Sequence, residues 1–421
     1  MSADERADLP AAPTSREIAR ALDLALEVRQ RLRDRSPRET ATALAAAARC
    51  WIEDEELHRG LPAVARLSAP MVGSVLPRVA AAFDVEAMVE LVNRERGMSP
   101  PPGLVAAVVA SNVPALAVPA IALGCLAGAA VLVKSGRGDP LSAPAFHRAL
   151  AAVDSELAAT VVPAYWPGGT STLEQAALAR AEVVVASGSD LTMEALRRRV
   201  GRRLVAHGTR TSVVALDIRR ERCVDTLARA VALDVVLYDQ RGCLSPQVAL
   251  VAGDCEAFAD ALVRALAALR PVLPPGEATL EERAAIRLAI EEASWAGAHA
   301  VRAGLGGTVL VETWADLRPG PGGRTIRVCP LDSLRALPTA LPRGRIECIA
   351  IHGDEVDVAA LEARGVARLC QPGRMQEPPL AWPRGQRPAL GSLLRPDDPM
   401  RTLLDERTLP ASAMRTCPEA P

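Results

Sequence analysis

Apolar residues recur at every third or fourth position in the first hundred residues of the chain. Two such stripes are clear: Ile18, Leu22, Ala25, Val28 and Leu32, and then Val85, Met88, Val89 and Val92. This spacing is typical of amphipathic helices that turn one face to a core. It predicts a helical region over residues 14–100, which the sequence Ser-Pro-Pro-Pro-Gly at 99–103 ends.

After residue 103 the pattern changes to short apolar runs that alternate with helical segments. We expect strands at 105–110, 130–134, 161–163, 183–186, 204–206 and 213–216. We expect helices at 114–126, 172–179, 191–200 and 223–231. The strands at 105–110 and 130–134 do not alternate polar with apolar residues, which is typical of strands buried on both faces of a parallel sheet. The alternation predicts an α/β fold with a doubly wound parallel sheet.

These patterns divide the chain into four parts. A helical N-terminal region, 1–100, is expected to pack on a cofactor domain, 101–215, which a second α/β domain follows at 216–370. The segment 371–421 is rich in Pro and Arg, and we expect it to be partly irregular. Residues 104–133 carry no charge, yet Asn112 and two prolines interrupt them, so we expect no membrane span there.

Composition narrows the class of protein. The 421 residues carry a net charge of −1, which indicates neither a nucleic-acid partner nor an anionic membrane surface. The nine cysteines are scattered without any C-x-x-C, and the five histidines are isolated, so we expect no metal site and no disulfide framework. The polar, acidic N-terminus is not a signal peptide. We therefore expect a cytoplasmic protein with reduced thiols.

Lys134 is the only lysine in a chain whose other basic residues are all arginine. It ends the apolar run Val131-Leu132-Val133, which places it at the carboxyl end of a predicted strand. Ligands bind at that end of the strands in open α/β sheets. An ammonium is a compact point charge that a guanidinium does not replace, so Lys134 is a candidate ligand-binding residue.

Cys243 lies in the second informative stretch, Gly242-Cys243-Leu244-Ser245-Pro246. Gly242 permits a tight turn, which we expect to open a new element. At a helix N-terminus the local positive potential would lower the pKa of the thiol, and Cys243 is therefore a candidate nucleophile. The dinucleotide fingerprint G-x-G-x-x-G follows none of the predicted strands, so a dinucleotide site would need a different phosphate-binding turn.

Several stretches together resemble the aldehyde dehydrogenase superfamily. They are Ala-Ser-Asn-Val-Pro at 110–114, Val-Leu-Val-Lys-Ser at 131–135, Val-Val-Val-Ala-Ser-Gly-Ser at 183–189 and Asp-Gln-Arg-Gly-Cys-Leu-Ser-Pro-Gln at 239–247. With Ala-Tyr-Trp-Pro-Gly-Gly at 164–169 they are similar to its acyl-CoA reductase branch, the family of the long-chain fatty-acyl reductase of bacterial bioluminescence. The motifs occur in that family's order over most of the chain.

The resemblance implies an aldehyde-dehydrogenase-like fold and an activity. Cys243 would be the nucleophile, with the Asn112 side chain and the Cys243 backbone N–H holding the oxyanion. The residues expected to bind the cofactor are Lys134, Ser135, Arg137, Gly188 and Ser189. Arg137 stands where NAD-preferring members carry an acidic residue, which favours a 2′-phosphate and hence NADPH.

The implied reaction is the NADPH-dependent reduction of a long-chain fatty acyl-CoA or acyl-protein thioester to the aldehyde. The family also implies a homo-oligomer and an acyl-transferring partner. Two departures stand out. The stretch 204–210, with His207, lacks the carboxylate that activates water in aldehyde-oxidising members, and the Trp382 segment lacks the His and Asp of this branch. The absence of that base suits a reductase, because the acyl-enzyme must survive until hydride arrives.

Three alternatives remain open from the sequence. Another reductase of the superfamily would reduce a small acyl phosphate, and cationic groups lining the site would favour it. A cysteine thioesterase or acyltransferase would form the same acyl-enzyme without hydride transfer. A non-catalytic scaffold is the third alternative, against which the joint presence of Asn112, Lys134 and Cys243 argues.

Overall fold

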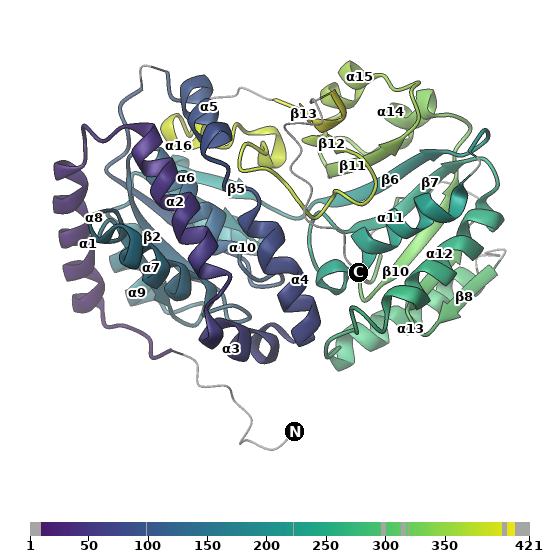
Figure 1. Cartoon of the computed structure of the whole chain (residues 1–421), viewed down its shortest axis with the longest axis horizontal. Helices are drawn as coiled ribbons and strands as arrows, with labels where there is room; N and C mark the ends of the chain where they lie inside the picture. Colours follow the sequence, from purple (N-terminus) through teal and green to yellow (C-terminus); the bar gives the residue numbers. More distant parts are fainter. Residues whose placement is uncertain are drawn as a thin grey trace.

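The computed structural model describes residues 10–97, 99–221, 223–295, 300–312, 317–318, 320–397 and 402–408. They form two lobes, each built on its own sheet (Figure 1). The first lobe contains the N-terminal helices and a five-stranded sheet, and the second contains an eight-stranded sheet. The arrangement confirms an α/β protein with a helical N-terminal region and two sheets.

Five helices make up the N-terminal region: α1 (Ser15–Arg31), α2 (Pro37–Trp51), α3 (Glu55–Ala65), α4 (Ala69–Ala80) and α5 (Val85–Glu95). Each starts after a residue whose side chain accepts a hydrogen bond from the first turn: Thr14, Ser36, Asp54, Ser68 and Asp84. The predicted apolar stripes are the buried faces, since Ile18, Leu22 and Val28 of α1 are buried. The helical region that the spacing predicted is therefore confirmed.

The sheet of the first lobe is parallel throughout, in the order β3-β2-β1-β4-β5. Its strands are β1 (Leu104–Val108), β2 (Ala130–Ser135), β3 (Val161–Tyr165), β4 (Val183–Ser187) and β5 (Leu204–His207). Its helices are α6 (Ala117–Leu126), α7 (Ser142–Val153), α8 (Ser155–Ala158), α9 (Ser171–Leu178) and α10 (Asp190–Val200). Alternate strand residues pack with α1, α9 and α10 on one face and with α6 and α7 on the other. The sheet is doubly wound, as predicted.

The sheet of the second lobe has the order β13-β12-β11-β6-β7-β10-β9-β8. Only the β8–β9 pair at one edge is antiparallel. Its strands are β6 (Thr211–Asp217), β7 (Pro246–Ala252), β8 (Ala300–Gly304), β9 (Gly307–Val311), β10 (Thr325–Pro330), β11 (Ile346–His352), β12 (Arg368–Cys370) and β13 (Leu404–Asp405). The helices are α11 (Val224–Val236), α12 (Cys255–Leu269), α13 (Leu280–Trp295), α14 (Leu337–Ala340) and α15 (Val358–Ala363).

The chain passes from the first sheet to the second between His207 and Thr211. The strand expected at 213–216 is β6, which pairs with β7 and β11. Strand β6 therefore belongs to the second sheet, whereas the predicted cofactor domain, 101–215, included most of it. An apolar run does not reveal which neighbours a strand will pair with, so the pattern could not place this change of sheet.

Residues 390–395 of the C-terminal segment lie against the first lobe, and residues 404–405 pair with the second sheet. The short helix α16 (Gly391–Leu394) lies beside α5 (Figure 1), where the backbone N–H of Leu390 donates to the Glu95 carboxylate at 2.8 Å. Arg395 donates to the Ser99 hydroxyl at 3.0 Å. Strand β13 then pairs with β12. In the described part of the segment expected to be partly irregular, α16 and β13 thus contact one lobe each.

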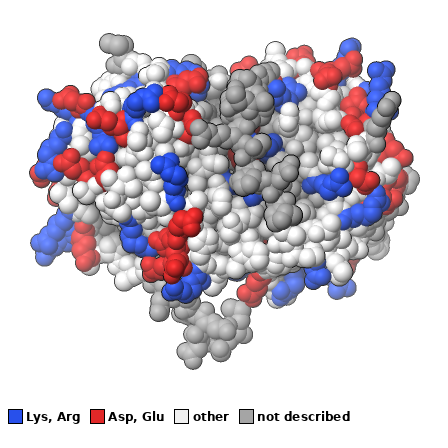
Figure 2. Space-filling view, in the orientation of Figure 1, with Lys and Arg blue, Asp and Glu red and all other residues white. Residues whose placement is uncertain are grey.

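The uncharged run 104–133 contains β1, α6 and β2. Among the described residues, no helix is long and apolar enough to cross a bilayer, and no cluster of His, Cys, Asp and Glu side chains is suited to a metal ion. Basic and acidic side chains are interspersed on the face that Figure 2 shows.

Candidate active site

A cavity of about 830 Å³ lies where the two lobes meet. From the first lobe it is lined by the turn after β1, the N-terminus of α10 and the segment after β5. From the second lobe it is lined by the loop around Cys243, the start of β11 and the C-terminal segment 376–387. The cavity therefore lies at carboxyl ends of parallel strands of the first sheet, which is where α/β proteins bind ligands.

The loop that carries Cys243 follows an unusual turn. Tyr238, Asp239 and Gln240 all have left-handed backbone angles, with φ of 58°, 51° and 61°. Residues other than glycine adopt this conformation only where the surroundings enforce it. Arg324 donates to the Asp239 carboxylate at 2.9 and 2.6 Å, and the Gln240 amide donates to the Thr325 carbonyl at 2.8 Å. These buried contacts hold the strained turn.

Replacement of Arg324 by methionine is expected to lower the free energy of unfolding by about 3–5 kcal/mol, because it leaves the buried Asp239 carboxylate without its cation. Urea denaturation monitored by circular dichroism measures the change. The matched control is Arg335→Met, since Arg335 pairs with Glu355 on the surface and its loss should cost far less. Equal losses in the two variants would contradict a stabilising role for the buried pair.

Cys243 itself is open to the cavity, and its carbonyl accepts a hydrogen bond from the Ser212 hydroxyl at 2.6 Å. The protein atoms around the cavity limit hydration of the thiol, and together with the negative charge of Glu347 they raise its pKa to about 12. The chain continues into β7 at Pro246. The expected helix N-terminus after Cys243 is therefore wrong, because the next element is a strand, and the pKa of the thiol is raised where we expected it lowered.

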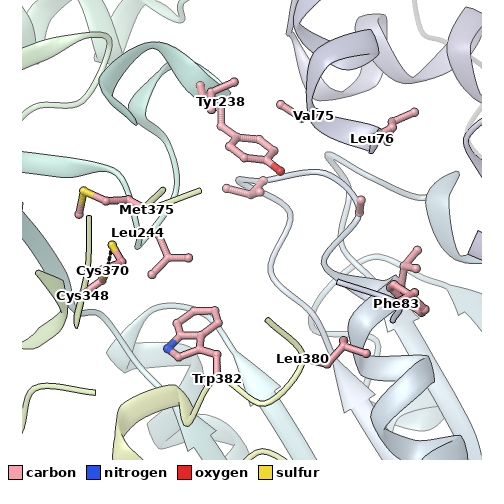
Figure 3. Packing of buried hydrophobic residues seen from close by; sticks show 14 of the residues in the cluster. Val75, Leu76, Phe83, Tyr238, Leu244, Cys348, Cys370, Met375, Leu380 and Trp382 are labelled. Atoms are coloured by element: carbon pink, nitrogen blue, oxygen red, sulfur yellow. Dashed lines mark hydrogen bonds between the residues drawn. The ribbon is translucent and has the colours of Figure 1, made fainter. Parts of the chain in front are cut away.

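The neighbouring Leu244 packs beside Met375 and near Trp382 (Figure 3). All three are buried, and Met375 and Trp382 both belong to the C-terminal segment. The Gln376 amide also donates to the Ser245 hydroxyl at 3.0 Å. The C-terminal segment thus fixes the loop that follows the cysteine.

Asn112 approaches Cys243 from the other lobe. Its side-chain amide donates to the Arg241 carbonyl at 2.6 Å. The turn is anchored by the buried Asp139 carboxylate, which accepts a hydrogen bond from Ala115 N–H at 2.6 Å. A side chain on Gly138 would collide with the Ser111 backbone, so the two segments need this glycine to approach. The structure therefore brings Asn112 and Cys243 into one cavity.

Helix α6 begins only at residue 117, three residues later than predicted.

The residues expected to bind a cofactor fall into two places. Gly188 and Ser189 line the cavity, where the Ser189 hydroxyl caps α10 by accepting a hydrogen bond from Thr192 N–H. Lys134, Ser135 and Arg137 are not among the residues that line the cavity. They lie at and beyond the end of β2.

Lys134 is half-buried, and its ammonium is 6.0 Å from the centre of the Trp166 ring. Burial lowers the pKa of this ammonium. The hydroxyl of Ser135 is buried and has no partner among the described residues, while Arg137 is exposed.

His207 lies at the end of β5, where oxidising relatives would carry a carboxylate, and it lines the cavity. Burial, together with the charges of Arg384, Arg387 and Arg210, lowers the pKa of its imidazole to about 3. The imidazole is therefore neutral at physiological pH. A group that gives up its proton so readily is a weak base toward water.

Two further residues of the cavity escaped the sequence analysis. Glu347 begins a buried stretch of β11, where its carboxylate accepts a hydrogen bond from Gly385 N–H at 3.0 Å and pairs with Arg210 at 3.4 Å. Burial raises the pKa of Glu347. A lone carboxylate in the apolar run Ile-Glu-Cys-Ile was a signal that could have identified it. Arg384 carried no comparable signal, because arginine is abundant throughout the chain.

One wall of the cavity is apolar. It is formed by residues of α4, of α6 and of the segment after Gln376: Val79, Ala82, Leu116, Pro119, Leu123 and Leu380. The lining also contains cationic side chains: Arg78, Arg210, Arg241, Arg345, Arg384 and Arg387. The cavity is therefore lined by groups suited to a ligand that combines an apolar chain with a polar or anionic group.

Solved structures with the same fold come from aldehyde dehydrogenases. Aldehyde dehydrogenase 21 of Physcomitrella patens is 16% identical, with a TM-score of 0.69 over 91% of this chain and 89% of that one. An indole-3-acetaldehyde dehydrogenase of P. syringae, solved with NAD+, is 15% identical, with a TM-score of 0.66 over 86% and 82% of the two chains. The two-lobed chain thus has the fold of these aldehyde dehydrogenases.

The family of the chain follows from the sequence comparison. The model of the family described as acyl-CoA reductase (LuxC) matches residues 74–392. The chain belongs to this acyl-CoA reductase family.

Relatives with assigned names match over part of the chain. The long-chain acyl-protein thioester reductase of Aliivibrio fischeri is 25% identical over 287 residues, which are 65% of this chain and 59% of that protein. The protein of the same name from Photobacterium phosphoreum is 28% identical over 254 residues, 56% and 51% of the two chains. The chain thus covers less than two thirds of the length of these relatives.

Proposed function

We propose that this protein reduces a fatty acyl thioester, carried by coenzyme A or by a protein, to the aldehyde, with NADPH as the hydride donor and Cys243 as the acyl carrier. The observation that supports this most directly is the meeting of Cys243 and the Asn112 turn in one cavity with an apolar wall. The names of the relatives from Aliivibrio fischeri and Photobacterium phosphoreum point to the same class of substrate.

The apolar wall favours a fatty acyl group over a small acyl phosphate. A chain laid along Val79, Ala82 and Leu123 would be removed from water, which contributes about 0.8 kcal/mol per buried methylene. The cationic groups of the lining would suit an acyl phosphate, but they do not account for its apolar residues. A thioester with a long acyl chain would contact both the apolar residues and the cationic groups.

The residues at the α10 N-terminus fit a nicotinamide dinucleotide. Backbone N–H groups after Gly188 face the cavity, and a helix N-terminus attracts a diphosphate. The Asp190 carboxylate in this first turn pairs with Arg345 at 3.5 Å, which offsets its negative charge. The unpartnered hydroxyl of Ser135 and the ammonium of Lys134, at the end of β2, are suited to ribose hydroxyls. NADPH bound there would supply the hydride.

The protein's own groups perform the acyl transfer. The Cys243 thiol gives up its proton, its sulfur attacks the thioester carbonyl, and the bond from that carbon to the carrier sulfur breaks. The carrier thiol leaves with a proton, and the acyl group stays on Cys243. One hydrogen of the Asn112 amide is held by the Arg241 carbonyl, so the second remains for the oxyanion, together with the Cys243 N–H. A neutral His207 of low basicity protects the acyl-enzyme from hydrolysis.

The test is a turnover assay of the full chain with acyl-CoAs of several lengths and with NADPH or NADH. Aldehyde formation that depends on both substrates supports the proposal. Release of free fatty acid without cofactor oxidation would identify a thioesterase instead. Reduction of a small acyl phosphate, with no activity on acyl-CoA, would identify the other reductase.

Replacement of Arg137 by glutamate is expected to weaken NADPH binding far more than NADH binding. The change replaces a charge-assisted hydrogen bond to the 2′-phosphate, which contributes about 1.5–3 kcal/mol, with repulsion, so the preference should shift about tenfold or more. Dissociation constants for both cofactors measure this. The control Arg202→Glu makes the same charge change at an exposed site of the same lobe. An unaltered NADPH/NADH ratio in Arg137→Glu would refute the assignment of NADPH.

A further inference from the structure

Arg384 is a cation of the Cys243 cavity whose guanidinium contacts an aromatic ring but no carboxylate among the described residues. Its side chain is partly buried and lies over Trp382, with the guanidinium carbon 5.0 Å from the ring centre. The guanidinium makes no hydrogen bond and no ion pair with any residue that the structure describes, and burial lowers its pKa. Withdrawing a charge from water without pairing it is unfavourable. Such a group is suited to an anion that forms or binds in the cavity.

Hydrogen bonds connect Arg384 with Cys243 through the start of β11. The Ser212 hydroxyl donates to the Cys243 carbonyl at 2.6 Å and accepts from Cys348 N–H at 3.2 Å. The residue before Cys348 is Glu347, whose carboxylate accepts from the N–H of Gly385, next to Arg384, at 3.0 Å. The Cys243 carbonyl and Gly385, the neighbour of Arg384, are therefore both linked to the start of β11. Both line the cavity.

We propose that Arg384 is a further catalytic residue, whose guanidinium is the counter-ion of the Cys243 thiolate. The inference rests on the proposed function, because it assigns a role to a neighbour of the proposed nucleophile. In the step concerned the sulfur–hydrogen bond breaks, the electron pair stays on sulfur and the proton leaves through the open cavity to water. The guanidinium then faces the negative sulfur, and it can hold the thiolate again when the aldehyde departs.

The charges around the thiol make this role necessary. Burial and Glu347 raise the pKa of Cys243, Cys348 raises it further, and Arg384 lowers it. Arg210 is already paired with Glu347, and the Arg387 guanidinium donates to the Pro396 carbonyl at 2.9 Å. His207 is neutral. Arg241, on the loop of Cys243 itself, is held by the carbonyls of residues 65 and 66. Among these groups Arg384 is the cation that remains for the sulfur.

The experiment measures alkylation of Cys243 by iodoacetamide in the full-length protein, followed by mass spectrometry of the Cys243 peptide between about pH 7 and 9, where thiolate populations control reactivity. Arg384→Gln should raise the thiol pKa by about one unit or more. Tenfold less thiolate, partly offset by its greater nucleophilicity, gives an alkylation rate about three- to tenfold lower. Arg384→Lys, which keeps the charge, should restore most of the rate.

The matched control is Arg374→Gln. Arg374 lies in the same C-terminal segment outside the cavity and pairs with Glu377 at 2.8 Å, so its replacement should leave the alkylation rate unchanged. Circular dichroism verifies that each variant is folded.

Three outcomes have distinct meanings. An unchanged alkylation rate in Arg384→Gln, with a raised KM for acyl-CoA, would overturn the proposal and indicate that Arg384 binds the coenzyme A part of the substrate. If Arg384→Lys does not restore the alkylation rate, the proposal is also overturned, because the positive charge would then be insufficient and the effect would come from the stacking of Arg384 on Trp382. If the wild-type chain forms no aldehyde at all, the proposed function fails, independently of how Arg384 affects alkylation.

Discussion

Replacement of Cys243 by alanine is expected to abolish both acyl transfer to the protein and aldehyde formation. The variant lacks the sulfur that accepts the acyl group, and no other nucleophile can occupy the same position in the loop between Gln240 and β7. Incubation with radiolabelled acyl-CoA in the absence of NADPH should label the wild type covalently, and hydroxylamine should remove the label because thioesters react with it. The alanine variant should carry none.

The matched control is Cys255→Ala at the start of α12. Cys255 lies outside the cavity, where its thiol points to the Val251 carbonyl at 3.8 Å, so this variant should be labelled like the wild type. Label that persists in Cys243→Ala and disappears in Cys255→Ala would transfer the role of nucleophile to Cys255. Label that persists in both would refute a cysteine acyl-enzyme at either position.

Replacement of Asn112 by alanine is expected to lower the turnover by about 10²–10³-fold, the usual effect of removing one oxyanion donor. The affinity for NADPH should change little, because Asn112 lies on the turn after β1 and not on the turn before α10. Steady-state kinetics and cofactor titration measure the two effects.

Asn112 also holds the Arg241 carbonyl, so a second measurement must separate catalysis from positioning. Alkylation of Cys243 by iodoacetamide forms no oxyanion. If Asn112 stabilises the oxyanion, alkylation proceeds at nearly the wild-type rate while acyl transfer falls. If both reactions slow down together, Asn112 serves only to position the loop of Cys243, and its assignment as an oxyanion donor is wrong.

The helices and strands were largely predictable because their signals are local. The capped apolar stripes of 14–100 became α1 to α5, and the uninterrupted apolar runs became the central strands of the first sheet. The start of α6 was placed too early. Pro114 is compatible with a first helical turn, but Asp139 captures the N–H of Ala115, which has a left-handed φ of 66°, so the helix begins only at Ala117. That contact spans 24 residues and has no local signal.

The environment of Cys243 was the least predictable feature. Gly-Cys-Leu-Ser-Pro indicated a tight turn, and the turn exists, but the element after it is a strand. The pKa of a thiol depends on its burial and on the charges around it. Here the charges are those of Glu347 and Arg384, which lie more than a hundred residues away in the sequence. A motif identifies the residue type and predicts the turn. The electrostatics of the site depend on segments that are distant in the sequence and adjacent only in the folded chain.

By itself the sequence determined the class of fold, the identity of the cysteine and asparagine motifs, and the family, because periodicity and short motifs are properties of neighbouring residues. The tertiary structure decided which sheet β6 joins, how segment 376–387 closes the cavity, and which charges surround the thiol. These features depend on strand pairing and on contacts between the lobes. They result from the balance of burial, hydrogen bonding and charge over the whole chain, which no local pattern encodes.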